Sequence, residues 1–282
     1  AWLLWPSPHR DTGQPPPSGS TDSAADLHAV TGTPPSIAVL PFETLGAAAG
    51  QDYLARGMAA DLTRGLSRIS GLTVLGPWAT GTDAPDQRAP LAAARYRLWG
   101  GIRREGDDLE LHLVLIDAAS AEQVWAHRER HRIDRVLALP EILATDLTAA
   151  LGVRITADER AHLARRCTTD HRAYDAFLQA QVALLTRTAE ENRRARTLYA
   201  RALALDPAFA RAHGGMALSH AADYRNGWSE APERSLDLAR ESALTAARID
   251  PEVPEVLWTI AYVHVREGDH AAAMPHIDEH RS

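Results

Sequence analysis

The sequence contains no lysine, and all 30 of its long-chain basic residues are arginine. The absence of lysine excludes a phosphate-binding loop of the Walker type, a Schiff-base enzyme and a serine–lysine dyad, because each needs the lysine amine. The sequence also has a single cysteine, Cys167, which excludes an internal disulfide. We expect this thiol to be structural, since no base or oxyanion site accompanies it in the sequence.

The chain has no net positive charge. The formal net charge is -7, so the chain lacks the overall basic character that is typical of a nucleic-acid binder. We therefore expect no nucleic-acid partner for this region. Apolar residues make up 45% of the 282 residues and charged residues 24%, a composition that supports two ordinary globular domains.

Long hydrophobic runs are missing as well. Residues 1–5 are apolar and include two tryptophans, but a membrane-spanning helix needs about 20 residues. Because tryptophan is enriched where such helices meet water, we expect residues 1–5 to end a transmembrane helix that lies upstream of residue 6. Residues 6–35 are rich in Pro, Gly and Ser, and this composition predicts a linker.

Residues 36–152 show strand and helix patterns in turn. A short apolar run between prolines at 36–42 predicts a buried strand. Apolar residues spaced by four and three between 54 and 69 predict an amphipathic helix, and leucines that alternate with polar residues at 109–115 predict a strand. Further strands are expected at 72–75, 96–102 and 123–130, and further helices at 91–94 and 132–151. The order predicts an α/β domain, a mixed sheet with helices on one face.

Several short motifs in this domain resemble a known family. They are VLPF at 39–42, YLARGM at 53–58, DL at 61–62, LWGGIRR at 98–104, LIDA at 115–118 and VWA at 124–126. Together they are similar to the TolB-like amino-terminal domain found in bacterial signalling proteins. The chain departs from the family pattern at Ala60, where the family has an acidic residue before Asp61, and in the loop at 77–90.

The last part of the chain, 173–282, carries an internal repeat. Leu205-Asp206-Pro207 recurs as Ile249-Asp250-Pro251, 44 residues later, and alanines spaced by four and three precede each copy. This pattern resembles tetratricopeptide repeats, in which small residues let helices pack closely and proline follows the second helix. The family period is about 34 residues, so we expect about 10 extra residues around 224–230.

The domain plan follows from these patterns. We expect an all-α tetratricopeptide solenoid of about three repeats at 173–282, truncated at the carboxyl end, and a connecting segment at 153–172 after the TolB-like domain. Such arrangements resemble the carboxy-terminal region of class III adenylate/guanylate cyclase-like signalling proteins. The resemblance implies a non-catalytic sensory or protein-interaction region that regulates a cyclase domain outside this chain. It also implies a bacterial inner-membrane protein with this region on the extracytoplasmic side, and a homodimer is our expectation for the full-length protein.

Two other functions are also compatible with the sequence. One is the equivalent region of a winged-helix transcriptional regulator. The other is a hydrolase with an unrecognised site in the first domain.

The candidate site residues are those of a partner groove. We expect a protein or peptide ligand to lie in the concave surface of the repeats. The groove residues are Tyr224, Trp228, Trp258, Tyr262 and Arg194. We expect no catalytic residue, no cofactor and no metal. The most site-like cluster, the two histidines and the glutamate at 127–131, is interpreted as a solvated edge strand because two arginines interleave with them.

Overall fold

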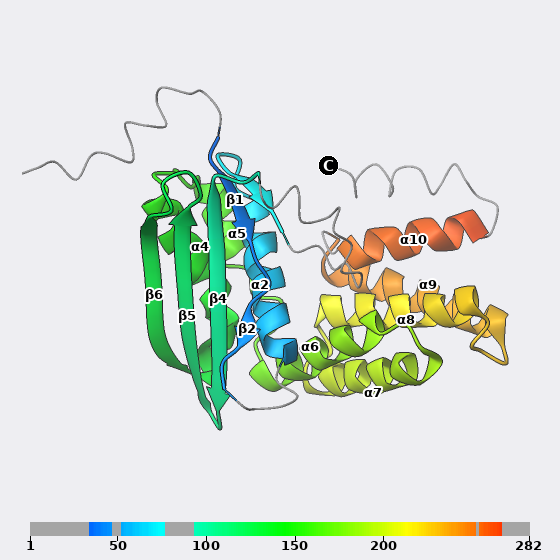
Figure 1. Cartoon of the computed structure of the whole chain (residues 1–282). Helices are drawn as coiled ribbons and strands as arrows, with labels where there is room; N and C mark the ends of the chain where they lie inside the picture. The colour runs from blue at the N-terminus through cyan, green and yellow to red at the C-terminus, as the bar shows by residue number, and fades with distance from the viewer. Residues whose placement is uncertain (1–33, 47–51, 77–92, 252–253, 267–282) are drawn as a thin grey trace, which may run out of the picture. The chain divides into compact units, whose positions relative to one another are not determined.

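The structure, a computed structural model, describes residues 34–46, 52–76, 93–251 and 254–266. Within these residues the chain forms a six-stranded mixed sheet and a series of helices (Figure 1). The strands are β1 (Ser36–Val39), β2 (Glu43–Thr44), β3 (Thr73–Leu75), β4 (Tyr96–Glu105), β5 (Asp108–Asp117) and β6 (Gln123–Arg132). Their order is β3-β1-β4-β5-β6, and β2 extends the pairing along β4.

The three long strands form an antiparallel meander. Gly106, with a φ of 61°, makes the tight turn from β4 to β5, a left-handed conformation that glycine adopts without strain. The predicted alternation in β5 is confirmed: Leu109, Leu111, Leu113 and Leu115 are buried on one face. The short strands β1 and β3 pair in parallel, as do β1 and β4, so the sheet is mixed as predicted. Strand β2 is not predicted, because two residues carry no period.

Helices cover the leucine face of the sheet. They are α2 (Asp52–Ser67), the 3₁₀ helix η2 (Ile133–Ala138) and α4 (Leu139–Ala150), followed by the short α5 (Ala157–Leu163). The helix predicted at 132–151 is therefore two helices. Pro140 lies in the first turn of α4, where its missing N–H costs no hydrogen bond, so the α-helix starts there. The short helix predicted at 91–94 lies partly outside the described residues, and residues 93 and 94 are not helical.

The remaining described helices pack one after another. They are α6 (His171–Leu185), α7 (Ala189–Leu205), α8 (Ala210–Asn226), α9 (Pro232–Ile249) and α10 (Pro254–Arg266). Buried alanines such as Ala195, Ala202, Ala239 and Ala243 lie where these helices meet. The 44 residues between the two repeated Asp-Pro pairs are mostly those of α8 and α9. Only residues 227–231 join these two helices.

The terminal predictions fall outside the described residues. These include the membrane-helix end at 1–5, nearly all of the linker at 6–35, and the expected end of the last repeat after residue 266. Among the helices that are described, none has the length and apolar character needed to cross a bilayer.

A stripe on α2 joins the sheet layer to the helical series. Tyr53, Gly57 and Asp61 are four residues apart, so they share one face of α2, and this face packs on α6. The Tyr53 hydroxyl donates to Asp175 of α6 at 2.8 Å, and Tyr174 of α6 donates to Asp61. These three residues, which we call the docking stripe, belong to the motifs that resemble the TolB-like family.

Gly57 allows the close approach of the two helices. A Cβ atom at this position would lie 2.5 Å from a methyl carbon of the buried Leu178 on α6. One buried cluster of apolar side chains accordingly runs from Ile37 in the sheet to Ala212 in α8. The sheet and the first helices of the series therefore share a core.

We predict that Gly57→Val lowers the free energy of unfolding by about 1–3 kcal/mol, because the added side chain collides with Leu178 in a filled core. The matched control is Ala60→Val on the exposed face of the same helix, which changes only helix propensity and should cost less than about 1 kcal/mol. Urea unfolding followed by circular dichroism measures both. Equal losses in the two variants would contradict close packing at Gly57.

Candidate functional site: a junction pocket and an aromatic groove

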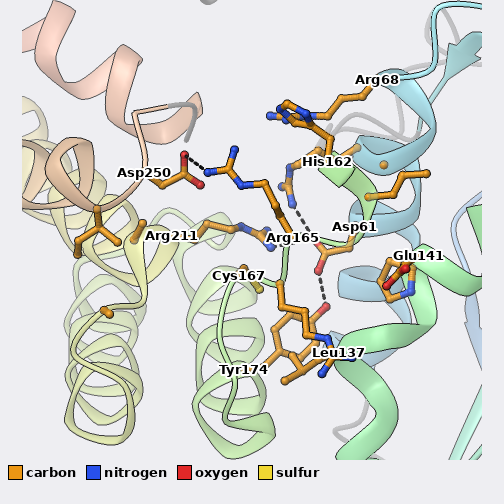
Figure 2. Close-up of a pocket in the computed structure, with 18 residues that line it drawn as sticks. Asp61, Arg68, Leu137, Glu141, His162, Arg165, Cys167, Tyr174, Arg211 and Asp250 are labelled. Carbon is orange, nitrogen blue, oxygen red and sulfur yellow. Dashed lines mark hydrogen bonds and ion pairs between the residues drawn. The ribbon is translucent and has the colours of Figure 1, made fainter. Parts of the chain in front are cut away.

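One pocket lies where the sheet layer meets the helical series. Its volume is about 310 Å³, and Figure 2 shows its labelled side chains converging from several elements. We call it the junction pocket. Its charged and polar lining consists of Asp61 and Arg64 from α2, Arg68 directly after α2, Glu141 from α4, His162 from α5, Arg165, Arg166 and Cys167 from the segment after α5, Tyr174 from α6, Arg211 from α8 and Asp250 after α9.

Asp61 lies at the centre of this pocket. Its carboxylate is 3.0 Å from Arg211 Nη1 and 2.7 Å from Arg64 Nη1, and it accepts a short hydrogen bond from the Tyr174 hydroxyl. The side chains of Asp61 and Arg211 are 10% and 11% exposed, so their ion pair is shielded from water. The Arg211 guanidinium also stacks over the Phe177 ring, 4.6 Å from its centroid. One carboxylate thus holds α2, α6 and α8 together.

The surroundings fix the protonation of these groups. Burial raises the pKa of Asp61, but the charges of Arg211 and Arg64 and the Tyr174 hydrogen bond outweigh it, so the pKa falls below its ordinary value. Burial, followed by the negative charge of Asp61, raises the pKa of Tyr174 well above its ordinary value. Asp61 is therefore an anion and Tyr174 a neutral donor at physiological pH.

Cys167 lines the same pocket, in surroundings that disfavour its thiolate. Burial raises the pKa of its thiol, and the nearby Asp61 adds to the shift, although Arg211 opposes it. A reactive cysteine needs the opposite shift, because the thiolate is the nucleophile. The prediction that Cys167 is structural agrees with this environment.

The pocket lining suits an anionic group. It carries the five arginines at 64, 68, 165, 166 and 211 against the three carboxylates at 61, 141 and 250. Arginine side chains recognise carboxylates and phosphates through two parallel N–H donors. The sequence did not reveal this pocket, because its lining residues come from seven helices and the segments between them, spread over positions 61 to 250. The only local signal is Asp61, which belongs to a quoted motif.

A second hollow lies on the helical series, between α8, α9 and α10. Its volume is about 290 Å³, and its lining consists of Tyr224, Arg225, Pro232, Glu233, Tyr262 and Arg266. We call it the aromatic groove. Arg266 donates to the Tyr224 hydroxyl at 3.3 Å and lies over the Tyr224 ring, 5.3 Å from its centroid. The Trp258 and Tyr262 rings stack in parallel, with centroids 5.2 Å apart.

The structure brings some of the predicted groove residues together and separates others. Tyr224 and Tyr262 line the aromatic groove, and Trp258 supports it through its stack on Tyr262. Trp228 lies in the short connection after α8, half-buried and outside the lining. Arg194 lies on α7, 63% exposed, and pairs with Glu191 at 3.3 Å on the same helix. The arginine of α7 that reaches α8 is Arg196, which pairs with Asp223 at 2.7 Å.

The histidine cluster differs from its prediction. Strand β6 is at the edge of the sheet among the described residues, and Arg128, Glu129 and Arg130 are exposed, as expected. The side chains of His127 and His131 are only 9% and 14% exposed, so the prediction that they are solvated is wrong. The reason is the register, which places His127 opposite the buried Leu113 and His131 opposite the buried Leu109, on the helix-covered face.

Comparison with known sequences gives one informative similarity. No protein-family model matches the chain. Over 263 residues, 92% of its length, the chain is 29% identical to a protein of Rhizobium meliloti (strain 1021) named "Putative adenylate cyclase 3". The match covers 44% of that protein, so this chain spans less than half of its relative's length.

Similarities to solved structures are weak. TolB from Acinetobacter baumannii is 17% identical with a TM-score of 0.31, over 42% of this chain and 28% of that one. The PelC dodecamer subunit from Paraburkholderia phytofirmans is 18% identical with a TM-score of 0.29, over 43% of this chain and 90% of that one. TM-scores this low do not establish a shared fold, so the fold is defined by its own strand order and helix packing.

We predict that Asp61→Asn lowers the free energy of unfolding at pH 7 by about 3 kcal/mol, because it leaves a buried arginine without its counter-charge. The control is Asp237→Asn, whose carboxylate is 59% exposed and pairs with Arg240 at 3.6 Å on the surface. Its loss should be below about 1 kcal/mol. Urea unfolding of both variants against the wild type measures the difference.

The pH dependence gives an independent check. The folded pKa of Asp61 is lower than its ordinary value of 3.8, so its contribution is fully present above pH 3.8 and is lost as the pH falls through the folded pKa. The gap in stability between the wild type and Asp61→Asn should therefore shrink below pH 3.8. A gap that stays constant into strong acid would show that the charge of Asp61 is not the stabilising element.

Proposed function

We propose that this chain is the non-catalytic regulatory region of a bacterial signalling protein whose remaining part carries an adenylate or guanylate cyclase domain. The similarity to the Rhizobium meliloti protein supports a link to cyclic-nucleotide signalling, since it extends over 92% of the chain. More than half of that relative lies outside the match, which leaves room for a separate cyclase domain. The name of the relative favours a cyclase over the winged-helix regulator.

The proposal includes the finer domain assignments. In it, β1 to α4 form a TolB-like domain, and α6 to α10 form tetratricopeptide repeats. The quoted motifs support the first assignment. The sequential packing of helices through buried alanines and the recurring Asp-Pro pairs, Asp206-Pro207 and Asp250-Pro251, support the second.

The observation that carries the regulatory role is the path of α8. This helix starts with Arg211 in the junction pocket and reaches Tyr224 in the aromatic groove. Arg211 and Tyr224 are 13 positions apart, which corresponds to about 20 Å along one rigid helix. The antiparallel α9 makes the same link, because Glu233 near its start lines the groove and Asp250 after its end lines the pocket.

In the proposed mechanism, the aromatic groove receives a segment of a partner protein. The stacked pair of Trp258 and Tyr262 offers a flat apolar surface to a partner side chain, and Arg225 and Arg266 offer donors to a carboxylate. Binding that tilts α8 or α9 changes the ion pair between Arg211 and Asp61 at the other end of α8. The docking stripe on α2 carries this change to the sheet.

The membrane anchor remains a prediction that rests on residues 1–5. The extracytoplasmic location of this region and the homodimer also remain predictions. The membrane anchor is tested by fractionation of cells that express the full-length gene product, since an anchored protein stays with the membranes after a high-salt wash.

The regulatory proposal is tested in the full-length gene product, expressed at matched levels in the bacterium of origin, where the partner is present. We expect the cells to make cyclic AMP or cyclic GMP, and both Tyr262→Ala and Asp61→Asn to change its level by about fivefold or more, the range of ordinary allosteric coupling. Arg194→Ala is the control, because the structure places Arg194 away from both sites. Its product level should match the wild type.

Two outcomes contradict different parts of the proposal. Absence of any cyclic nucleotide above the level of cells that lack the gene would refute the cyclase assignment. Cyclic nucleotide at equal levels in all four proteins would refute the regulatory role of the groove and the pocket.

A further inference from the structure

Strand β6 presents three potential metal ligands on one face. His127, Glu129 and His131 alternate along the strand, and their partners on β5 are the buried Leu113, Leu111 and Leu109. All three side chains therefore start from the helix-covered face of the sheet. Because β6 is the edge strand among the described residues, this part of the face is only partly covered, and Glu129 is 59% exposed.

The two imidazoles are buried with unused nitrogens. The Nε2 atoms of His127 and His131 are buried, and neither makes a hydrogen bond within the described part of the chain. A buried polar atom without a hydrogen bond destabilises the fold, so such atoms are rare in folded proteins and call for an explanation. Two of them, four residues apart on one strand, point to a missing partner common to both.

The three ligand atoms converge. Residues four apart on a strand have Cα atoms about 13 Å apart, yet the His127 and His131 rings lean toward each other until their centroids are 5.9 Å apart. Glu129 Oε2 is 3.4 Å from His131 Nε2 and 4.0 Å from His127 Nε2, and all three atoms lie within 4.8 Å of one another. Ligands about 2.0 Å from a tetrahedral zinc ion are about 3.3 Å apart, so small side-chain rotations complete the set.

The interleaved arginines do not oppose a cation here. Arg128 and Arg130 project from the opposite face of the sheet, where Arg128 is 3.5 Å from Glu110 and Arg130 is 3.8 Å from Glu105. Among the charged side chains that act on His131, the carboxylate of Glu129 has a larger effect than the guanidinium of Arg135 in η2.

We propose that His127, Glu129 and His131 form a zinc-binding site on the edge strand of the sheet. Two imidazole nitrogens and one carboxylate oxygen are ligands that Zn²⁺ prefers, and hard cations such as Mg²⁺ would favour oxygen alone. Because Glu129 is 59% exposed, water or a carboxylate from a partner can supply the fourth ligand. The site is independent of the cyclase proposal.

A second histidine and glutamate pair on the same sheet gives the matched control. His112 and Glu110 lie on the opposite face of β5, with His112 Nε2 2.8 Å from Glu110. Arg103 also donates to Glu110, at 2.6 Å, so this carboxylate already has its partners. The hydrogen bond to His112, followed by that to Arg103, lowers the pKa of Glu110 to about 2. This pair is satisfied without a metal, and we expect it to bind none.

The experiment measures zinc uptake by the full chain. Equilibrium dialysis against ZnCl₂, with zinc determined by atomic spectroscopy, should give about one tightly bound ion per chain. His127→Ala and Glu129→Gln should each weaken binding by more than about 100-fold, the upper range for loss of an outer-shell partner. His112→Ala should bind zinc as the wild type does. Glu129 is exposed, so its variant is expected to fold even if His127→Ala does not.

Cobalt substitution distinguishes this site from chance binding elsewhere. Co²⁺ bound by two histidines and a carboxylate in a tetrahedral site gives an intense visible absorption, which the Glu129→Gln chain should lack. The sequence has other histidines, at 270, 276 and 280, that could hold a metal. Zinc binding that survives both substitutions would place the ion there and overturn the proposal, as would the absence of stoichiometric zinc in the wild type.

Discussion

The buried carboxylate of Asp61 is the interaction on which the arrangement of this chain depends. It is shared by Arg211 from α8, Arg64 from α2 and Tyr174 from α6, and the first of these pairs is almost fully shielded from water. Burying these charges costs free energy of desolvation, so the ion pair fixes the relative positions of the helices as much as it stabilises the fold. Any other alignment of α2 with α6 and α8 would leave charges buried without partners. The shared apolar core from Ile37 to Ala212 packs around this cluster of charged side chains.

The two hollows of the helical series lie at opposite ends of the same helices. The start of α8 and the end of α9 line the junction pocket, and the end of α8 and the start of α9 line the aromatic groove. Helices are stiff over this length, so occupancy of one hollow and the geometry of the other are mechanically connected. The buried bonds of Asn192 to Ser219 and Asp223 hold α7 against the second half of α8.

Local patterns were sufficient to predict the sheet meander, the helix of the first domain and the helical series. The leucines at 109–115 and the spaced alanines before each Asp-Pro pair carry their periodicity in a few adjacent residues. The docking stripe was visible as a motif, but its partners were not, because Asp175 is 122 residues from Tyr53 and Tyr174 is 113 residues from Asp61. The sequence also does not show which arginine of α7 contacts α8: Arg194 pairs with Glu191 on its own helix, whereas Arg196 pairs with Asp223 of α8. At His127 and His131 the alternation was seen, but only the register with β5 shows that they face inward.

The docking stripe also determines which motions remain available. Near one end of α2, Tyr53 and Arg104 hold Asp175. Further along, Asp61 holds Tyr174 and Arg211, and Gly57 lies between the two anchors with Leu178 pressed against it. Sliding of α6 along α2 would break both anchors and drive Leu178 into the neighbouring side chains. Two anchors on one line define an axis, so a small rotation of α6 about that axis would strain these bonds less than a shift along it.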